Sequence, residues 1–179
     1  AASDVYKRQA VASFQPLSDK HTVTGDIPGD LPAATGDPMA TDIIVGQLLE
    51  NAFKYSPDGG TVAVRARLSR AESTAGSAAE SPDESPEESP EESPEENSDW
   101  IEVTVEDEGI GIADGDHERI FDRFFQGETG DRRRFGGVGI GLFIVRRLAE
   151  AQQGEITAGS RPSGGTAMRL RLRPAPAAP

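Results

Sequence analysis

Three segments of the chain alternate between apolar and polar residues, and this pattern limits the possible fold more than any other feature. The segments are TVAVRARL at 61–68, WIEVTVE at 100–106 and TAMRLRLRP at 166–174. Because successive side chains of a β-strand point to opposite faces, each segment predicts a strand with one apolar and one polar face. Together they predict a sheet that is covered on one side only.

Two more segments extend this predicted sheet. GEITAG at 154–159 and the turn RPSGG precede the last strand and predict a hairpin with it. KHTVTGDIP at 20–28 predicts a strand at the edge of the sheet.

Two helices are predicted beside the strands. Asp37 stands before a proline, and a capping carboxylate followed by a first-turn proline favours a helix start, so we predict a helix that continues to Tyr55. A second helix is predicted over 142–152 and ended by Gly154. One-sided helices and strands in this mixture predict an α/β fold of two layers, with a mixed sheet and the helices on one face.

Residues 71–99 separate two of the predicted strands and differ from the rest in composition. They hold eleven acidic residues, no Lys or Arg, and a repeated Ser-Pro-acid-acid unit. Regular prolines block helices and sheets and like charges repel, so we predict a disordered acidic insert. It is either a tolerated loop expansion or a docking or phosphorylation segment. The net charge of the chain is −13, which leaves −2 for the residues outside this insert. A negative net charge argues against nucleic acid as a partner.

Both ends of the chain and its composition set further limits. No cysteine is present, so disulfides and thiolate metal sites are excluded, and no apolar run reaches the roughly 20 residues that span a bilayer. The string SDVYKRQ resembles the conceptual translation of a sequencing adaptor. Residues 1–13 are therefore either a linker remnant or a sequencing artefact, and the chain is predicted to be truncated at its front. Residues 175–179 are predicted to be a disordered tail.

A polar stripe runs along the first predicted helix. Gln47, Asn51 and Lys54 are spaced four and three residues apart, which places them on one helix face. The stripe is either a solvated surface or one wall of a binding site.

The segment DEGIGI at 107–112 follows the strand at 100–106 directly. Asp107 offers a carboxylate, which only accepts hydrogen bonds. It suits the exocyclic amine of adenine and repels the carbonyl that guanine has at that position. Taken alone, the two glycines of this segment are equally typical of a simple turn.

Two further motifs follow. ERIFDRFFQG at 118–127 predicts a short helix whose aromatic residues either anchor a mobile lid or pack on the core. The next loop contains Arg132, Arg133 and Arg134, which either pair with phosphate or form an exposed basic loop. GGVGIGL at 136–142 opens the second helix, where free amides and the helix N-terminus favour a phosphate.

These pieces, in this order, resemble the ATPase domain of bacterial sensor histidine kinases, in the wider family of gyrase and the heat-shock-90 chaperones. LLENAFKYS corresponds to the N box, DEGIGI and GGVGIGL to the two glycine boxes, and IFDRFF to the F box. The resemblance covers about 14–174 and implies the Bergerat fold, an α/β sandwich that binds ATP between its helices and a lid.

The resemblance also implies a role for each matching residue. Asn51 would coordinate Mg²⁺, Lys54 would contact phosphate and Asp107 would bind the adenine amine. Gln47 stands where the family usually has Asn, so it would reach Mg²⁺ directly or through water, and it is no general base. The residues placed around ATP are Gln47, Asn51, Lys54, Tyr55, Asp107, Gly109, Gly111, Ile112, Arg123, Gly137, Gly139, Ile140, Gly141, Leu142 and Thr166.

The implied activity is transfer of the γ-phosphoryl group of ATP to a histidine on a separate dimerisation domain, from which a response regulator is phosphorylated. His21 and His117 lack the sequence context of such an acceptor. The domain would be cytoplasmic, and a membrane anchor in a longer parent protein stays open. An anti-sigma-factor-type serine kinase and a non-catalytic adenine-nucleotide-binding module are the alternatives, and the F-box aromatics favour the histidine kinase.

Overall fold

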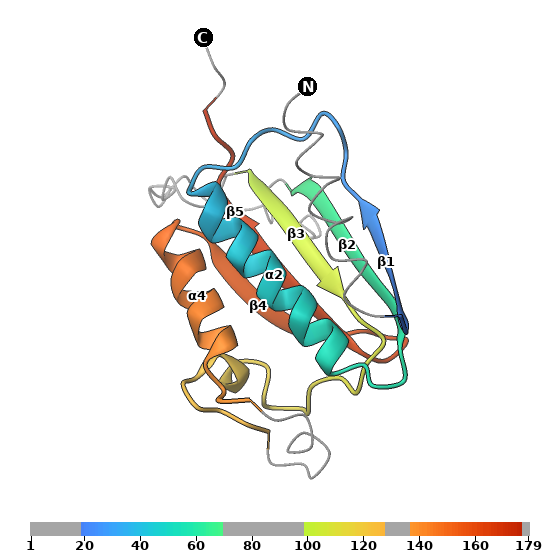
Figure 1. The fold of residues 1–179 in the computed structure, drawn as a ribbon. Coiled ribbons are helices and arrows are strands. Elements are labelled where there is room, and N and C mark those ends of the chain that lie inside the picture. The colour runs from blue at the N-terminus through green and yellow to red at the C-terminus, as the bar shows by residue number, and fades with distance from the viewer. Residues whose placement is uncertain (1–18, 70–98, 128–136, 177–179) are drawn as a thin grey trace, which may run out of the picture.

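The computed structural model describes residues 19–69, 99–127 and 137–176. Five strands form one sheet in the order β1-β2-β3-β5-β4, and helices α2 and α4 lie on the same face of it (Figure 1). The strands are β1 (His21–Asp26), β2 (Gly60–Ser69), β3 (Trp100–Glu106), β4 (Glu155–Ser160) and β5 (Thr166–Leu172). The helices are α2 (Pro38–Lys54), the 3₁₀ turn η2 (Arg119–Phe121) and α4 (Gly141–Ala151).

The sheet is mixed. β1 pairs with β2 in parallel, whereas the other three pairings are antiparallel, and β4 and β5 form the predicted hairpin. The predicted strand at 20–28 lies at the edge of the described sheet. These features confirm the two-layer α/β fold, with a mixed sheet covered on one face by helices.

The core lies between the helices and the inner face of the sheet. Leu48 of α2 and Val145 of α4 are almost fully buried, as are Val62, Val105 and Leu170 of the central strands. The alternating residues of the strands therefore face the helices as predicted, and burial of this apolar surface is the main force that joins the two layers.

The two helices begin and end close to their predicted residues. Asp37 caps α2, because one of its carboxylate oxygens accepts a hydrogen bond of 2.9 Å from the amide of Met39. α4 ends at Ala151, one residue before its predicted end. Gln153 then takes a positive φ of 56°. Gly154 follows it and lies against β5, where a Cβ would come within 2.5 Å of the Arg171 carbonyl oxygen.

Several predictions concern residues outside the described part of the chain. Residues 1–13 lie outside it, as does the acidic insert apart from Asp99. The insert connects strands that are indeed neighbours, since Ser69 pairs with Trp100. Of the predicted tail at 175–179, residues 177–179 lie outside the described part, and the amide of Ala175 donates a 2.7 Å hydrogen bond to the carbonyl of Ala33.

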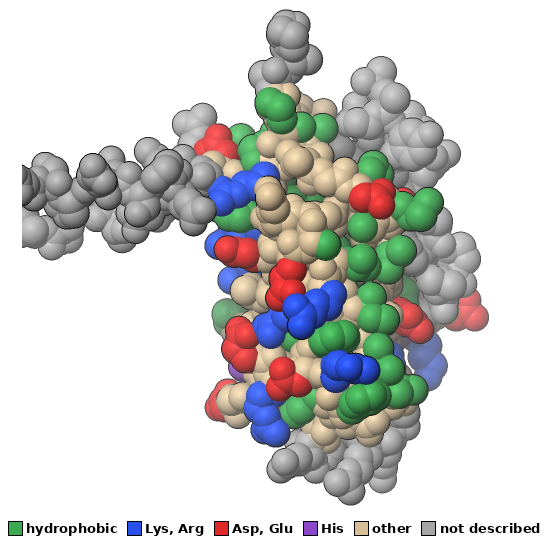
Figure 2. All heavy atoms as spheres, turned by 90° about the vertical axis from the view of Figure 1, so that its left-hand side faces the viewer, with side chains coloured by type: hydrophobic (Ala, Val, Ile, Leu, Met, Phe, Trp, Pro, Cys, Tyr) green, Lys and Arg blue, Asp and Glu red, His purple; other side chains and the backbone are tan. Residues whose placement is uncertain are grey.

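The described surface carries side chains of both charges, which agrees with the net charge of −2 outside the acidic insert. On the side of the molecule shown in Figure 2, Lys and Arg side chains are interspersed with Asp and Glu. Within the described residues, no helix has the length and apolar character needed to cross a membrane.

Candidate functional site

A cavity of about 300 Å³ opens between α2, the ends of β3 and β5, and the start of α4. Thirteen of the fifteen residues that the resemblance places around ATP line it, so segments far apart in sequence meet at one site. They are Gln47, Asn51, Lys54, Tyr55, Asp107, Gly111, Ile112, Gly137, Gly139, Ile140, Gly141, Leu142 and Thr166. Gly109 and Arg123 are the two that do not.

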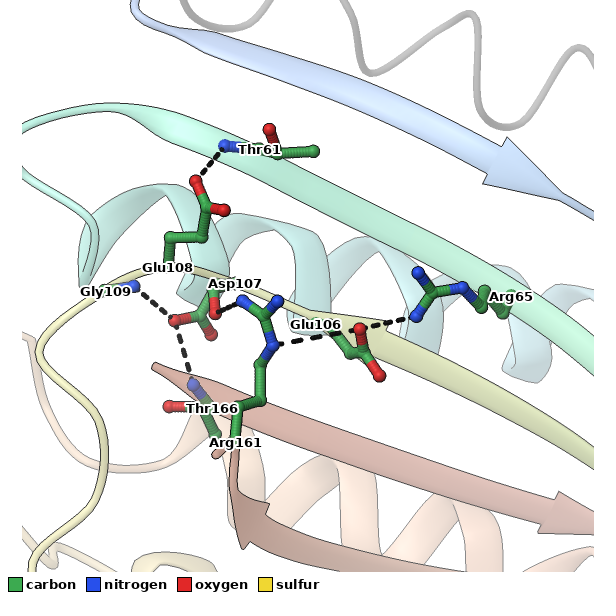
Figure 3. Close-up of polar contacts among 8 residues, drawn as sticks. All are labelled: Thr61, Arg65, Glu106, Asp107, Glu108, Gly109, Arg161 and Thr166. Carbon is green, nitrogen blue, oxygen red and sulfur yellow. Dashed lines mark hydrogen bonds and ion pairs between the residues drawn. The ribbon is translucent and has the colours of Figure 1, made fainter. Parts of the chain in front are cut away.

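Asp107 lies at the inner end of the cavity, directly after β3, and its side chain is held by the backbone. Its Oδ1 accepts hydrogen bonds from the amides of Gly109 (2.8 Å) and Thr166 (3.2 Å) (Figure 3). Its Oδ2 takes part in neither bond. Burial raises the pKa of Asp107, and these two hydrogen bonds together with the positive charge of Arg161 oppose that rise. The site therefore holds the carboxyl group of Asp107 in a fixed orientation in the cavity.

Gly109 was predicted to line the pocket but lies behind it. Its amide fixes Asp107 Oδ1, and the following amide, of Ile110, donates a 3.0 Å hydrogen bond to the Tyr55 carbonyl at the end of α2. Glu108 continues this support, because its carboxylate accepts a 2.9 Å hydrogen bond from the amide of Thr61 on β2 (Figure 3). The structure thus places Gly109 against the Asp107 side chain and outside the lining of the cavity.

The polar stripe of α2 forms one wall of the cavity. The side-chain Nδ2 of Asn51 is buried and has no hydrogen-bond partner within the described residues. The amide of Gln47 lies against Gly141 at the start of α4, and its Nε2 donates a 3.3 Å hydrogen bond to Glu50. Buried amide groups are usually hydrogen-bonded, so the Asn51 side chain is suited to contact a ligand in the cavity.

Lys54 brings a positive charge to the same wall. Its ammonium group lies against Gly137, where a Cβ would come within 2.7 Å of Nζ, and it also lies 5.2 Å from the centre of the Tyr55 ring. Within the described residues no carboxylate pairs with it. An ammonium group beside glycine amides at the start of a helix is an arrangement that attracts anions such as phosphate.

The segment at 118–127 is less helical than predicted. Only Arg119–Phe121 forms a 3₁₀ turn, because Phe124 takes a positive φ of 63° and its amide donates a 2.8 Å hydrogen bond to the Gly139 carbonyl. Gly139 itself has φ of 70°, and a Cβ there would lie 2.7 Å from the Phe125 carbonyl oxygen. The glycine is therefore required where this segment crosses the start of α4.

Arg123 was predicted to help bind phosphate but points elsewhere. Its guanidinium lies 5.2 Å from the ring centre of Phe124 and 5.5 Å from that of Phe143, beside a second cavity on the outer side of α4. Arg132, Arg133 and Arg134 lie outside the described residues.

Sequence reasoning did not assign several lining residues to the site. Val105 and Met168 close the cavity from the ends of β3 and β5, and Ile120 and Phe125 close it from the segment at 118–127. Their apolar periodicity indicated only burial, which is the same for a core position and for a cavity wall. Gln126 also lines the cavity and donates a 2.8 Å hydrogen bond to the Gly137 carbonyl.

The side chains that could act as metal ligands show whether the cavity suits the predicted Mg²⁺. The described residues contain no group of three or more His, Cys, Asp or Glu side chains that could enclose a metal ion. The cavity instead offers the neutral amides of Asn51 and Gln47. Amide oxygens are suitable ligands for Mg²⁺ when phosphate oxygens and water supply the rest of its coordination, so these residues fit the ion.

Comparisons with known proteins agree with this architecture. A family model described as histidine kinase-, DNA gyrase B- and HSP90-like ATPase matches residues 36–176, so β1 precedes the matched region. Sensor-like histidine kinase SenX3 of Mycobacterium bovis is 33% identical over 150 residues, which are 84% of this chain and 30% of that protein. Sensor histidine kinase RcsC of Escherichia coli K12 is 30% identical over 144 residues, 80% of this chain and 12% of that protein. The chain thus spans less than a third of these relatives.

Solved structures share the fold. Full-length ShkA in complex with AMPPNP superposes with a TM-score of 0.67 at 21% identity, over 95% of this chain and 30% of that one. The ATP binding domain of PrrB from Mycobacterium tuberculosis superposes with a TM-score of 0.63 at 20% identity, over 97% of this chain and 93% of that one. The family model covers most of the chain, and the four motifs meet at one cavity. The chain therefore belongs to the family of histidine kinase-, DNA gyrase B- and HSP90-like ATPases.

Proposed function

We propose that this chain is the ATP-binding catalytic domain of a two-component sensor histidine kinase. It would bind ATP with Mg²⁺ and donate the γ-phosphoryl group to a histidine on a separate dimerisation domain. The proposal is supported above all by one observation: a carboxyl group and an ammonium group line the same cavity. An oriented carboxyl group, that of Asp107, lies in this cavity, and the ammonium group of Lys54, which has no carboxylate partner within the described residues, lies beside the glycines that open α4.

Each part of ATP has a matching group in this cavity. The carboxylate of Asp107 accepts from the adenine amine, and Ile112 and Met168 offer apolar contact to the base. At the other end, Lys54 and the amides from Gly137 to Gly141 neutralise the phosphates. Mg²⁺, held by the amide oxygen of Asn51 with Gln47 beside it, would supply charge neutralisation between the phosphates.

The chain's contribution to phosphoryl transfer is positioning and charge neutralisation. The bond from the γ-phosphorus to the bridging oxygen breaks as a bond to an imidazole nitrogen forms, and ADP leaves. The two histidines of this chain are engaged elsewhere. His21 lies within 2.8 Å of the Ser56 carbonyl and His117 within 3.1 Å of the Ser160 hydroxyl, and neither lines the cavity. The acceptor would therefore come from another domain, and a response regulator would take the phosphoryl group from it.

Nucleotide binding to single-residue variants tests the two ends of the site. Asp107→Asn should weaken both ATP and adenosine, because the new amide group turns a donor or a neutral acceptor toward the adenine amine. Lys54→Gln should weaken ATP while leaving adenosine nearly unchanged. Calorimetry measures both, and equal effects of the two variants on both ligands would contradict the assignment. Asp122→Asn serves as a control. Asp122 lines the second cavity, on the outer side of α4, so this variant should bind ATP and adenosine like the parent chain.

Phosphotransfer tests the kinase assignment separately. The chain, γ-labelled ATP and a dimerisation domain from a relative such as SenX3 should together give an acid-labile label on that domain. The same domain without its acceptor histidine is the control. ATP binding without any phosphohistidine would leave a nucleotide-binding module, and an acid-stable label on a serine of a partner protein would favour the serine kinase.

A further inference from the structure

The turn between β4 and β5 places the charged side chain of Arg161 against the main chain of Asp107. We propose that Arg161 is a positioning residue of the adenine subsite, which fixes the main chain at Asp107 and places a positive charge beside its carboxyl group. The proposal rests on the assignment of Asp107 to adenine given above. It adds a residue that lies about fifty positions away in sequence and that belongs to none of the four motifs.

The contacts of Arg161 are directed at the main chain of Asp107. Its Nη1 donates a 2.6 Å hydrogen bond to the Asp107 carbonyl, and its Nε lies 3.8 Å from a carboxylate oxygen of Glu106 (Figure 3). The Arg161 side chain is only 21% exposed. A short hydrogen bond from a largely buried guanidinium is of the stronger, charge-assisted kind.

The other side of the same carbonyl is equally restricted. Gly165 has φ of 90°, and a Cβ there would lie 2.0 Å from the Asp107 carbonyl oxygen. The amide of Asp107 donates a 2.9 Å hydrogen bond to the Thr166 carbonyl. The Asp107 peptide is therefore held between Gly165 and Arg161, and its side chain leaves the backbone in one direction.

The charges around Asp107 give Arg161 a second effect. Burial opposes ionisation of this carboxyl, and among the causes that favour ionisation the positive charge of Arg161 is the one that comes from a cation. Glu106 shares its carboxylate between Arg161 and Arg65, which lies on the other side of it at 2.5 Å (Figure 3). The charged groups on the elements around Asp107 are Glu106 and Glu108 on its own segment, Arg161 from the turn, and Glu50 and Lys54 of α2, which line the same cavity.

Ionisation decides which base the site accepts. An ionised carboxylate accepts from the amine of adenine, whereas a protonated carboxyl can also donate to the carbonyl of guanine. Preference for ATP over GTP should therefore fall as the pH is lowered through the pKa of Asp107. Removal of the Arg161 charge raises that pKa, so the preference should be lost at a higher pH.

The experiment measures the affinities of the whole chain for ATP and GTP by calorimetry, from neutral pH down to the lowest pH at which the chain stays folded. The ratio of the ATP affinity to the GTP affinity is compared between pH values. The triphosphate ionises alike in both nucleotides, so its contribution to the pH dependence cancels in this ratio. In Arg161→Gln the pH at which the affinity ratio is half-way through its change, its midpoint, should be higher than in the parent chain. ATP affinity at pH 7 should fall about fivefold. In Arg161→Lys, which keeps the charge, the midpoint should stay near that of the parent chain.

Two controls separate the possible outcomes. Arg65→Gln removes the other partner of Glu106 without touching Asp107 and should leave the ratio unchanged. Asp107→Asn should abolish the pH dependence of the ratio. If it does not, the adenine assignment itself fails, whereas a normal Asp107→Asn result with an unmoved midpoint in Arg161→Gln overturns only the role of Arg161.

Folding of the variants is checked by thermal unfolding. If Arg161→Gln does not fold, Arg161→Lys decides the question at pH 7. Retention of most of the preference for ATP supports the proposal, and a loss as complete as that of Asp107→Asn overturns it. Equal weakening of ATP and GTP by Arg161→Gln at every pH would assign Arg161 a structural role only and also overturn it.

Discussion

Asp107 combines a cost to folding with a specific use in binding. Its carboxyl is 5% exposed, and burial raises its pKa despite two hydrogen bonds from backbone amides. A group kept in a place that its charged form disfavours is a common property of functional sites. The same residue should therefore affect stability and binding in opposite directions.

Asp107→Asn should stabilise the chain without ligand at pH 7. Because burial raises the folded-state pKa of this acid above its unfolded value, the folded state of the parent chain loses stability as the pH rises through that interval. The variant does not titrate, so its advantage should be largest near pH 7 and should shrink as the pH falls. Urea unfolding at several pH values measures the difference, and an advantage that grows toward low pH would contradict the argument.

Asn51 is the residue that we propose as the main Mg²⁺ ligand of the chain, because it lines the cavity and carries a neutral amide oxygen. Asn51→Ala removes the amide oxygen, so the strengthening of ATP binding by Mg²⁺ should largely disappear, while binding of adenosine should change little. Calorimetry with and without Mg²⁺ measures this. Thr41→Ala, on the same helix but outside the cavity, is a matched control that should keep the Mg²⁺ effect.

At the scale of elements, α2 connects the core to the site. One face buries Ile44 and Leu48, and the adjacent stripe presents Asn51 and Lys54 to the cavity. The orientation of the stripe therefore depends on how firmly the helix packs and on where it begins. The Asp37 cap fixes that beginning.

Asp37→Ala should lower the free energy of unfolding by about 1 kcal/mol, since the amide of Met39 loses its acceptor at the first turn. Urea unfolding measures the loss. Asp42→Ala changes an exposed carboxylate of the same helix that caps nothing, and its effect should be smaller. ATP affinity should be retained in both variants, because the cap lies at the end of α2 far from Lys54.

The helices and strands were largely predictable because periodicity reports burial, and burial decides secondary structure in most of this chain. WIEVTVE gave the bounds of β3 without error, and α2 ends one residue before its predicted end at Tyr55. The turn at Phe124 was not predictable, because it depends on a hydrogen bond to Gly139 from a different part of the chain. The position of Arg123 followed from that turn and was missed for the same reason.

The site was predictable where a motif names a residue and unpredictable where only a tertiary contact does. Lys54 and Asp107 were assigned from their motifs, and the structure places both in one cavity. Nothing in the sequence connects Arg161 to Asp107, since the contact exists only once β5 lies beside β3. The strand order has the same origin, because alternation shows which face of a strand is buried and not which strand lies next to it.

At the scale of the whole molecule, the outer face of the sheet is joined by charges across three strands. Glu102 of β3 is 2% exposed and lies opposite Arg67 of β2 and Arg171 of β5. It accepts hydrogen bonds of 2.6 Å from Arg67 and 3.2 Å from Arg171. Burial alone raises the pKa of Glu102, but these two arginines outweigh it and hold that pKa below its usual value.

Glu102→Gln should destabilise the chain by about 2 kcal/mol at pH 7, because two charge-assisted hydrogen bonds are weakened at a buried position. A lowered folded-state pKa contributes stability above the unfolded value, and that contribution is lost as the pH falls through the folded-state pKa. The difference between variant and parent should therefore shrink at acidic pH. Unfolding at pH 7 and at successively lower pH, down through the folded-state pKa, measures it, and Glu155→Gln, at an exposed position of β4, is the weaker matched change.

The pairing of Ser69 with Trp100 has a consequence for engineering the molecule. The chain leaves β2 and enters β3 at adjacent points of the sheet, so whatever joins them needs no particular length. A fluorescent reporter, an affinity tag or the new ends of a circularly permuted chain could occupy this position. Asp107 follows the opposite end of the same strand, so nucleotide binding and insertion tolerance are separated by the length of β3.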